Sequence, residues 1–270
     1  MKKILTTKVI RKHKIREGLR PLQMLTCYDY QNALLLDETE LDLILVGDSL
    51  GNVILGHKTT VEVTIEEMTI FCSAVKRGAQ NTFVVGDLPF GTYTTLHSAL
   101  KNAIHLFQKS RVEALKLEGA CPHHLEIVER FTQSGIPVMG HIGLTPQSIH
   151  QLGGYYVHGK KEKTARALME QAKSLEKAGA FAIVLECVDA TLSKEITETL
   201  RIPTIGIGSG NQTDGQVLVL NDLLHSGPEA PPPFCQPITN LYQVKKQFIE
   251  NYLGDQNKDH EEIHNQPVLH

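Results

Sequence analysis

Two aspartates at the ends of short apolar runs are the first candidates for chemistry. Asp48 follows residues 43–46 and one glycine, and Asp87 follows residues 82–85 and one glycine. If these runs are neighbouring buried strands, the two carboxylates converge at one edge of the sheet. Two carboxylates completed by water and substrate oxygens suit Mg²⁺. The alternative is that each aspartate only forms a turn, but two carboxylates at the same height favour the metal site.

Three further charged residues stand in or after two other apolar runs. Lys116 and Glu118 are two positions apart, so their side chains point to the same side of a strand. A lysine on an inner face needs a partner, either a substrate carboxylate or a neighbouring acid. Glu186 follows residues 182–185 and has the position of a general base. A structural ion pair is the alternative, and we favour the functional interpretation.

His141 and a glycine-rich stretch give weaker signals. His141 closes an apolar run, where a structural and a functional role are equally open. Residues 206–210, GIGSG, fit a phosphate-binding loop or close packing at a strand end. Spacing therefore indicates an enzyme with a divalent ion on two aspartates, an anion-binding lysine and glutamates for proton transfer. That combination suits the enolisation of a 2-oxo acid.

These residues require a regular series of strands to position them. Eight short apolar runs, most of them closed by a polar residue or a glycine, alternate with helical patterns. We therefore predict an α/β fold, a single-domain (β/α)8 TIM barrel whose strand C-terminal ends form the site. The runs are residues 22–25, 43–46, 82–85, 114–117, 137–139, 181–185, 203–207 and 216–220.

The helical segments have recognisable ends. Thr64 and Glu67 form a capping box that opens a helix ending near Gly78. Residues 143–160 make a long, glycine-rich connection with Gly153–Gly154 as a hinge, which is typical of a lid or binding loop. Further helices are predicted after Thr94 or Thr95 to 110 and over 122–134, 162–177, 190–200 and 238–253.

The composition indicates a globular protein with small-molecule partners. A net charge of −3 gives no reason to expect nucleic acid or a membrane as partner. No apolar run approaches the roughly 20 residues that span a bilayer. Five widely spaced cysteines favour reduced thiols in the cytoplasm.

The two ends of the chain differ in character from the predicted barrel. We assign residues 1–253 to the barrel domain, including a basic N-terminal segment, and residues 254–270 to a polar, disordered tail. The N-terminal segment is not a secretory signal, because it lacks a continuous apolar stretch. A basic amphipathic helix or a transit peptide is conceivable. We favour a surface segment packed on the domain by Ile4, Val9 and Ile10.

Six motifs follow one another in order over residues 25–224. They are VGDSLGNVILGHKTTVEVTIEEM, VVGDLPFGTY, LKLEGA, GHIGLTPQSIHQLGGYYVHGK, VLECV and IPTIGIGSGNQTDGQVLVLNDLL. Together they resemble the motifs of the ketopantoate hydroxymethyltransferase family. The resemblance implies a barrel of the phosphoenolpyruvate/pyruvate type, Mg²⁺, and a homo-oligomer, often a decamer. It also implies transfer of a hydroxymethyl group from 5,10-methylenetetrahydrofolate to 3-methyl-2-oxobutanoate, giving 2-dehydropantoate for pantothenate synthesis.

The resemblance also implies roles for single residues. Asp48 and Asp87 match magnesium ligands that also line the substrate site, and Glu118 matches a neighbour that reaches the metal directly or through water. Ser49 and Lys116 match contacts of the 2-oxo acid. The proton acceptor at substrate C3 is matched by Glu186, whereas His141 matches a residue at the mouth without a firm role.

The C-terminal region departs from the family pattern. Asn221 stands where histidine is usual, and residues 225–237 lack a lysine that the family usually carries. Two alternatives stay open at this point. One is another magnesium-dependent 2-oxo-acid lyase or mutase of the same barrel superfamily, although residues 143–160 lack the cysteine that such an enzyme would use. The other is a catalytically silent barrel subunit.

Overall fold

The eight predicted strands close into one parallel barrel. The structure is a computed structural model, and it describes residues 4–264 of the chain. Neighbouring strands pair in sequence order, and β8 pairs with β1, so the predicted TIM barrel is confirmed. The strands are β1 Leu22–Thr26, β2 Leu43–Val46, β3 Phe83–Asp87, β4 Ala114–Glu118, β5 Val138–Gly143, β6 Ala182–Glu186, β7 Thr204–Ile207 and β8 Gly215–Leu218.

Alternate residues of each strand fill the barrel interior. Leu43 and Leu45 of β2 lie opposite Phe83 and Val85 of β3, and all four belong to one buried apolar cluster. Because side chains alternate along a strand, the next inward position after Val85 is Asp87. The apolar core therefore leads directly to charged side chains at the C-terminal ends of the strands.

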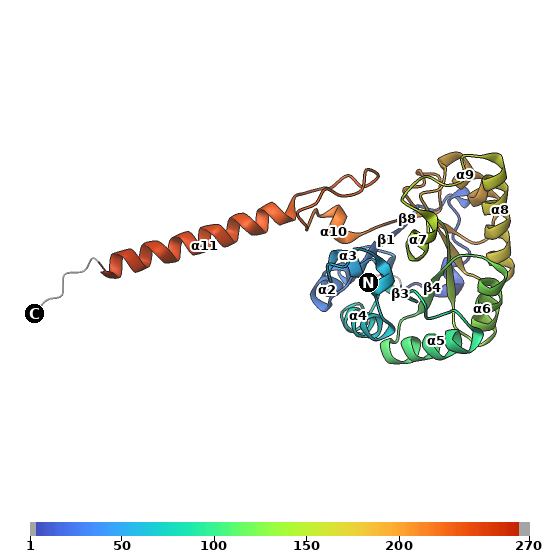
Figure 1. Ribbon diagram of the computed structural model, residues 1–270, viewed down its shortest axis with the longest axis horizontal. Coiled ribbons are helices and arrows are strands. Elements are labelled where there is room, and N and C mark those ends of the chain that lie inside the picture. The colour runs from blue at the N-terminus through green and yellow to red at the C-terminus, as the bar shows by residue number, and fades with distance from the viewer. Residues whose placement is uncertain (1–3, 265–270) are drawn as a thin grey trace, which may run out of the picture. The chain divides into compact units, whose positions relative to one another are not determined.

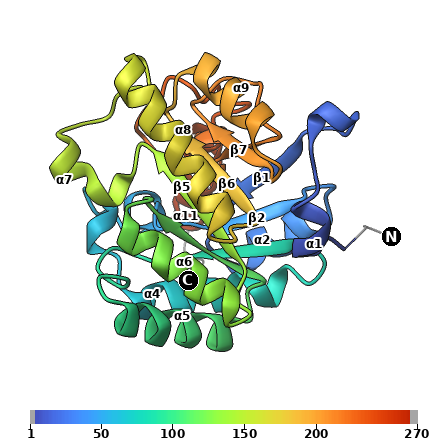
Figure 2. The ribbon, with the colours of Figure 1, turned by 90° about the vertical axis from the view of Figure 1, so that its right-hand side faces the viewer.

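Helices form an outer layer around the strands, as Figures 1 and 2 show. Thr64 and Glu67 form the predicted capping box of α4, and Thr95 caps α5. The covering helices are α2 Tyr30–Asp37, α4 Ile65–Gly78, α5 Leu96–Ser110, α6 Pro122–Gln133, α8 Glu162–Lys177 and α9 Ala190–Thr199. Short helices are α1 Thr7–Ile10, η1 Ile15–Glu17, α3 Leu50–Val53, η2 Thr60–Glu62, η3 Pro146–Ser148 and α7 Ile149–Leu152.

The strict alternation of strands and helices fails at one connection. β7 and β8 are joined by residues 208–214, which contain no helix. The chain crosses from the end of β7 back to the start of β8 over only seven residues, too few for a covering helix. Within the described residues, no helix is long and apolar enough to cross a membrane.

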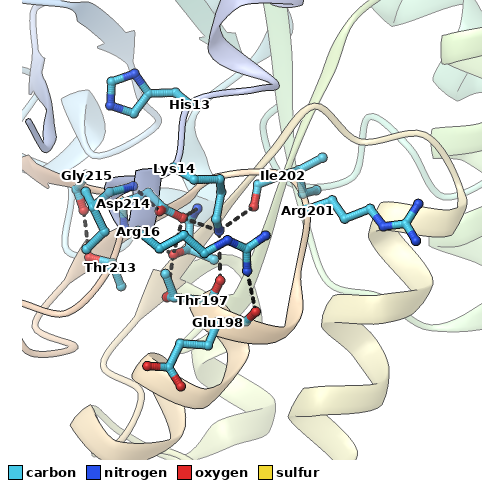
Figure 3. A network of polar contacts seen from close by, with 12 residues as sticks. His13, Lys14, Arg16, Thr197, Glu198, Arg201, Ile202, Thr213, Asp214 and Gly215 are labelled. Carbon is cyan, nitrogen blue, oxygen red and sulfur yellow. Dashed lines mark hydrogen bonds and ion pairs between the residues drawn. The ribbon is translucent and has the colours of Figure 1, made fainter. Parts of the chain in front are cut away.

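The N-terminal segment packs at the opposite end of the barrel from the charged residues. Ile10 is buried in the core cluster, as predicted, but Ile4 and Val9 are 62% and 39% exposed, so that part of the prediction is wrong. Lys14 anchors the segment instead. Its ammonium group lies 2.5 Å from Asp214 Oδ2 and also donates to the carbonyl oxygens of residues 197 and 202 (Figure 3).

The chain divides into two compact units, Met1–Val219 and Leu220–His270. The first contains all eight strands and the charged residues described below. The second contains α10 Leu220–Leu223, a proline-rich stretch and α11 Leu241–His264. Helix α11 continues past residue 253, where a helix end was predicted, into the segment predicted to be disordered. The domain boundary at 253 and the disorder of the tail stay predictions, and residues 265–270 lie outside the described part.

Candidate active site

Strands β3 to β6 bring the predicted charged residues together at one end of the barrel. Asp87 pairs in register with Lys116, and Glu118 with His141. Glu186 ends β6 opposite Gly143. These positions are an even number of residues from the inward-facing core positions of their strands, so their side chains also point into the barrel. They meet directly above the buried apolar cluster. The predicted inward orientation of Lys116 and Glu118 is borne out by side-chain exposures of only 4% and 3%.

Lys116 is surrounded by acidic groups. Its ammonium group lies 2.7 Å from Asp87 Oδ2 and 3.9 Å from Glu118 Oε1. Burial alone would lower the pKa of Lys116, but the negative charges of Asp87, Glu118 and Asp48 raise it. The lysine therefore remains a cation at neutral pH and can contact an anion.

Asp48 and Asp87 lie side by side, as predicted. The backbone N–H of Asp48 donates to Asp87 Oδ2 at 3.3 Å. Burial raises the pKa of both carboxyls; the charges of Asp87 and Glu118 raise that of Asp48 further, while Lys116 partly opposes the rise at Asp87. Asp87 Oδ1 is buried without a hydrogen-bond partner. A buried carboxylate oxygen left in this state is costly unless a ligand approaches it.

His141 stands between the two glutamates. Its Nδ1 lies 3.4 Å from Glu118 Oε1 and its Nε2 lies 3.2 Å from Glu186 Oε2. Burial and the charge of Lys116 lower the pKa of His141, but the two carboxylates outweigh them and raise it to about 9. The pKa of Glu118 is lowered, because the contact with His141 and the charge of Lys116 outweigh its burial. At neutral pH, His141 is thus an imidazolium whose two ring nitrogens face the two carboxylates.

Gln147 is a site residue that the sequence did not reveal. It lies in η3 of the long connection, and its Nε2 donates to Asp48 Oδ2 at 2.7 Å and to the carbonyl oxygen of Leu88 at 3.0 Å. Its backbone N–H donates to Glu118 Oε2, and its Oε1 accepts a hydrogen bond from Tyr93. The long connection predicted as a binding loop therefore contributes directly to the constellation.

Ser49 lies at the edge of the same site. Its Oγ is 2.8 Å from the hydroxyl of the buried Tyr28, a second residue that sequence reasoning missed. Ser49 is the N-cap of α3 but makes no side-chain capping bond. Its hydroxyl is therefore not committed to the helix. By contrast, the glycine stretch at 206–210 serves close packing, because the buried Ser209 bonds to Leu185 and Val188.

The donor set fits a magnesium ion on two aspartates. Four carboxylates meet two cations in this cluster, a net charge of −2 when all are ionised. In the described part of the chain, no group of three or more His, Cys, Asp or Glu side chains forms a metal-binding cluster. Magnesium commonly takes only one or two carboxylates and completes its shell with water and substrate oxygens. Both oxygens of Glu118 already contact His141 and Gln147, so its role at the metal stays a prediction.

Comparison with known proteins identifies the family. The profile described as "Ketopantoate hydroxymethyltransferase" matches residues 5–260. A relative from Geobacillus sp. (strain WCH70), named 3-methyl-2-oxobutanoate hydroxymethyltransferase, is 46% identical over 90% of this chain and 87% of its own length. A relative of the same name from Pseudothermotoga lettingae is 46% identical over 91% and 93%. The chain belongs to the ketopantoate hydroxymethyltransferase family.

Solved structures support the fold assignment. A phosphoenolpyruvate phosphomutase from Streptomyces platensis subsp. rosaceus superposes with a TM-score of 0.64, covering 93% of this chain and 89% of that one. Its sequence identity is 13%, so the likeness concerns the fold alone. Membership in the ketopantoate hydroxymethyltransferase family thus rests on the sequence matches, and the barrel agrees with it.

Proposed function

We propose that this chain is a 3-methyl-2-oxobutanoate hydroxymethyltransferase of pantothenate biosynthesis. It transfers a hydroxymethyl group from 5,10-methylenetetrahydrofolate to 3-methyl-2-oxobutanoate and gives 2-dehydropantoate. Relatives that carry this name at 46% identity support the assignment. The observation that carries it is the cluster of Asp48, Asp87, Lys116 and Glu186, which together can bind a 2-oxo acid and take up a proton.

In this proposal the keto acid binds between the aspartate pair and Lys116. Asp48 and Asp87 hold Mg²⁺, and Asp87 Oδ1 is an oxygen that still lacks a partner. When bound, the ion acts as a Lewis acid that stabilises negative charge on the substrate oxygens. Lys116 and Ser49 contact the substrate carboxylate, and Glu118 supports the metal site from beside Lys116. The raised pKa of Lys116 keeps its charge available for that contact.

Glu186 is the base that removes the proton from C3 of the substrate. Its side chain is 18% exposed, whereas those of Asp87, Lys116 and Glu118 are at most 4% exposed. Glu186 is therefore the most accessible carboxylate of the cluster. His141 Nε2 lies beside it at 3.2 Å. The substrate carbon that loses its proton forms the bond to the donor's methylene group. Water supplies the hydroxyl oxygen of the product as the two carbon–nitrogen bonds of the donor's methylene group break. Tetrahydrofolate leaves with the C3 proton and one water proton on its two nitrogens.

The activity is tested by measuring the rate at which 2-dehydropantoate forms from the two substrates with and without Mg²⁺. The role of Glu186 is tested by exchange of the C3 proton of 3-methyl-2-oxobutanoate with deuterium, followed by NMR. We expect Glu186→Gln to lose exchange about 100-fold or more, since general base catalysis contributes roughly 10²–10⁴-fold. Glu195→Gln on the surface of α9 is the matched control. Exchange at the wild-type rate in Glu186→Gln would refute this assignment.

We further propose a cytoplasmic homo-oligomer, a decamer. The five cysteines are free in the structure, which supports a reducing compartment. Family membership supports the assembly. Light scattering on the purified protein tests it, because a decamer has ten times the 30.0 kDa mass of one chain.

A further inference from the structure

Three aromatic side chains of the long connection gather beside Glu186. We call Tyr155, Tyr156 and His158 the aromatic rim. The rings of Tyr156 and His158 are stacked, with centroids 4.3 Å apart and an interplanar angle of 24°. Tyr155 and Tyr156 are 67% and 51% exposed. Exposed neighbouring aromatic rings offer flat apolar surface that a planar ligand can cover.

Backbone contacts anchor His158 of the aromatic rim to the residues that follow the proposed base. His158 forms a parallel bridge with Val188, its N–H donates to the carbonyl of Cys187 at 2.7 Å, and its carbonyl accepts from Asp189 at 2.8 Å. These partners directly follow Glu186 in the chain. At Gly159, φ is +83°, and a Cβ atom would lie 2.4 Å from Leu192 Cδ2, so the turn after His158 is packed tightly on α9.

Electrostatic effects agree with this placement. Burial and then the negative charge of Glu186 raise the pKa of Tyr155, and Asp48 and Glu118 add to the effect. Burial lowers the pKa of His158, and the charge of Glu186 opposes that shift. Tyr155 and His158 therefore lie within the field of the site carboxylates.

The other end of the segment is free to adjust. Gly153 and Gly154 have φ values of +76° and +149°, and nothing lies within 4 Å of a Cβ atom built on either. The two tyrosines thus stand between an unpacked glycine pair and a firmly anchored histidine. Such a segment can settle onto a ligand without disturbing β6.

We propose that the aromatic rim is the docking surface for the pterin ring of the one-carbon donor, with Tyr156 as its main stacking residue. This inference rests on the proposed function, which requires a flat aromatic donor to bring its methylene group to the carbon that Glu186 deprotonates. The exposed Lys160 and Lys161 follow immediately and can attract the carboxylates of the donor's glutamate tail. Neither 3-methyl-2-oxobutanoate nor 2-dehydropantoate has a ring.

The test compares Tyr156→Leu with Tyr156→Phe. Stacking on an aromatic side chain contributes about 1–3 kcal/mol for nucleobases, which converts to about 5- to 140-fold in affinity. We expect Tyr156→Leu to raise the KM for 5,10-methylenetetrahydrofolate and the Kd for tetrahydrofolate, measured by calorimetry, by that factor. Tyr156→Phe should stay within about twofold, because the ring is kept. Tyr30→Leu, an exposed tyrosine on α2, is the matched control.

Deuterium exchange at C3 separates this inference from the proposed function, because exchange requires the keto acid but no donor. Exchange and the KM for 3-methyl-2-oxobutanoate should be unchanged in Tyr156→Leu. An unchanged Kd for tetrahydrofolate in that variant overturns the inference, and so does an equal loss of exchange and donor binding, which would show a structural role. A folded wild-type protein with neither exchange nor product would instead refute the proposed function.

Discussion

Replacing Gln147 by leucine tests whether the long connection is part of the site. The substitution keeps an apolar side chain of similar size but removes the amide that donates to Asp48 and Leu88 and accepts from Tyr93. Gln147 is 5% exposed, so its partners are left largely without water. A buried polar group without a partner costs about 1–3 kcal/mol. The substitution leaves three such groups, on Asp48, Leu88 and Tyr93, and water that enters the space can bond to some of them. We therefore expect the free energy of unfolding to fall by about 3–6 kcal/mol.

The same change should alter the pH dependence of activity. The hydrogen bond from Gln147 lowers the pKa of Asp48, against burial and its acidic neighbours, which raise it. Without the amide, the pKa of Asp48 rises further, so less of the carboxylate is ionised at neutral pH. We expect kcat/KM at neutral pH to fall about tenfold and the acid limb of the pH profile to move to higher pH.

Denaturant unfolding and a pH profile of kcat/KM measure the two effects. Gln133→Leu removes an exposed glutamine amide on α6 and should change neither quantity. Tyr93→Phe removes only one of the three hydrogen bonds, so its destabilisation should be about a third as large. A Gln147→Leu protein with wild-type stability and an unmoved acid limb would refute the role given to this residue.

Three further outcomes follow from the charged groups. Lys14→Met leaves the completely buried Asp214 without its cation, so we expect it to lower the free energy of unfolding by about 3–5 kcal/mol, measured by thermal or denaturant unfolding. Adding Asp214→Asn should restore part of that loss. Equal stability of Lys14→Met and wild type would contradict this. Because the pKa values of Asp48 and Asp87 are raised, Mg²⁺ binding should displace protons from the pair. Calorimetry in buffers of different ionisation enthalpy measures that release, and equal heats in all buffers would argue against it. The folded pKa of His141, about 9, lies above the ordinary 6.5, so its contribution to stability is complete below about pH 6.5 and is lost as pH rises through 9. His141→Gln should therefore flatten the dependence of unfolding free energy on pH over that range in the metal-free protein. An unchanged slope would count against the imidazolium.

Much of the barrel and its charged end could be predicted because strand periodicity is local. Leu43–Val46 and its glycine place Asp48 at the end of β2, and the two-residue period places Lys116 and Glu118 on one face. Helix caps such as Thr64 are equally local. The resemblance to a family added what periodicity cannot provide, the chemical role of each residue.

Contacts between distant segments could not be predicted in this way. Gln147 lies in a connection without periodicity, and its amide reaches a residue 99 positions away. Lys14 was part of a basic stretch predicted to be a surface segment packed on the domain by apolar side chains, yet its partner Asp214 lies 200 positions along the chain. Neither pairing has a local signal. The length and glycine content of residues 143–160 were the only indication that this connection takes part in binding.

Buried charges are fully paired at one end of the barrel and incompletely paired at the other. This difference distinguishes the end that stabilises the fold from the end that binds ligands. At the N-terminal ends of the strands, the Lys14 ammonium has three acceptors, and Asp214 also accepts from the backbone of Ile15 and Thr204, as Figure 3 shows for the lysine. At the C-terminal ends, acids outnumber bases and Asp87 Oδ1 has no partner. A fully satisfied ion pair gains nothing from a ligand, whereas an unsatisfied, net negative cluster gains from a cation. The unpaired negative charge therefore lies at the C-terminal ends of the strands, where a metal ion and substrate can bind it. Binding of these ligands should raise the free energy of unfolding.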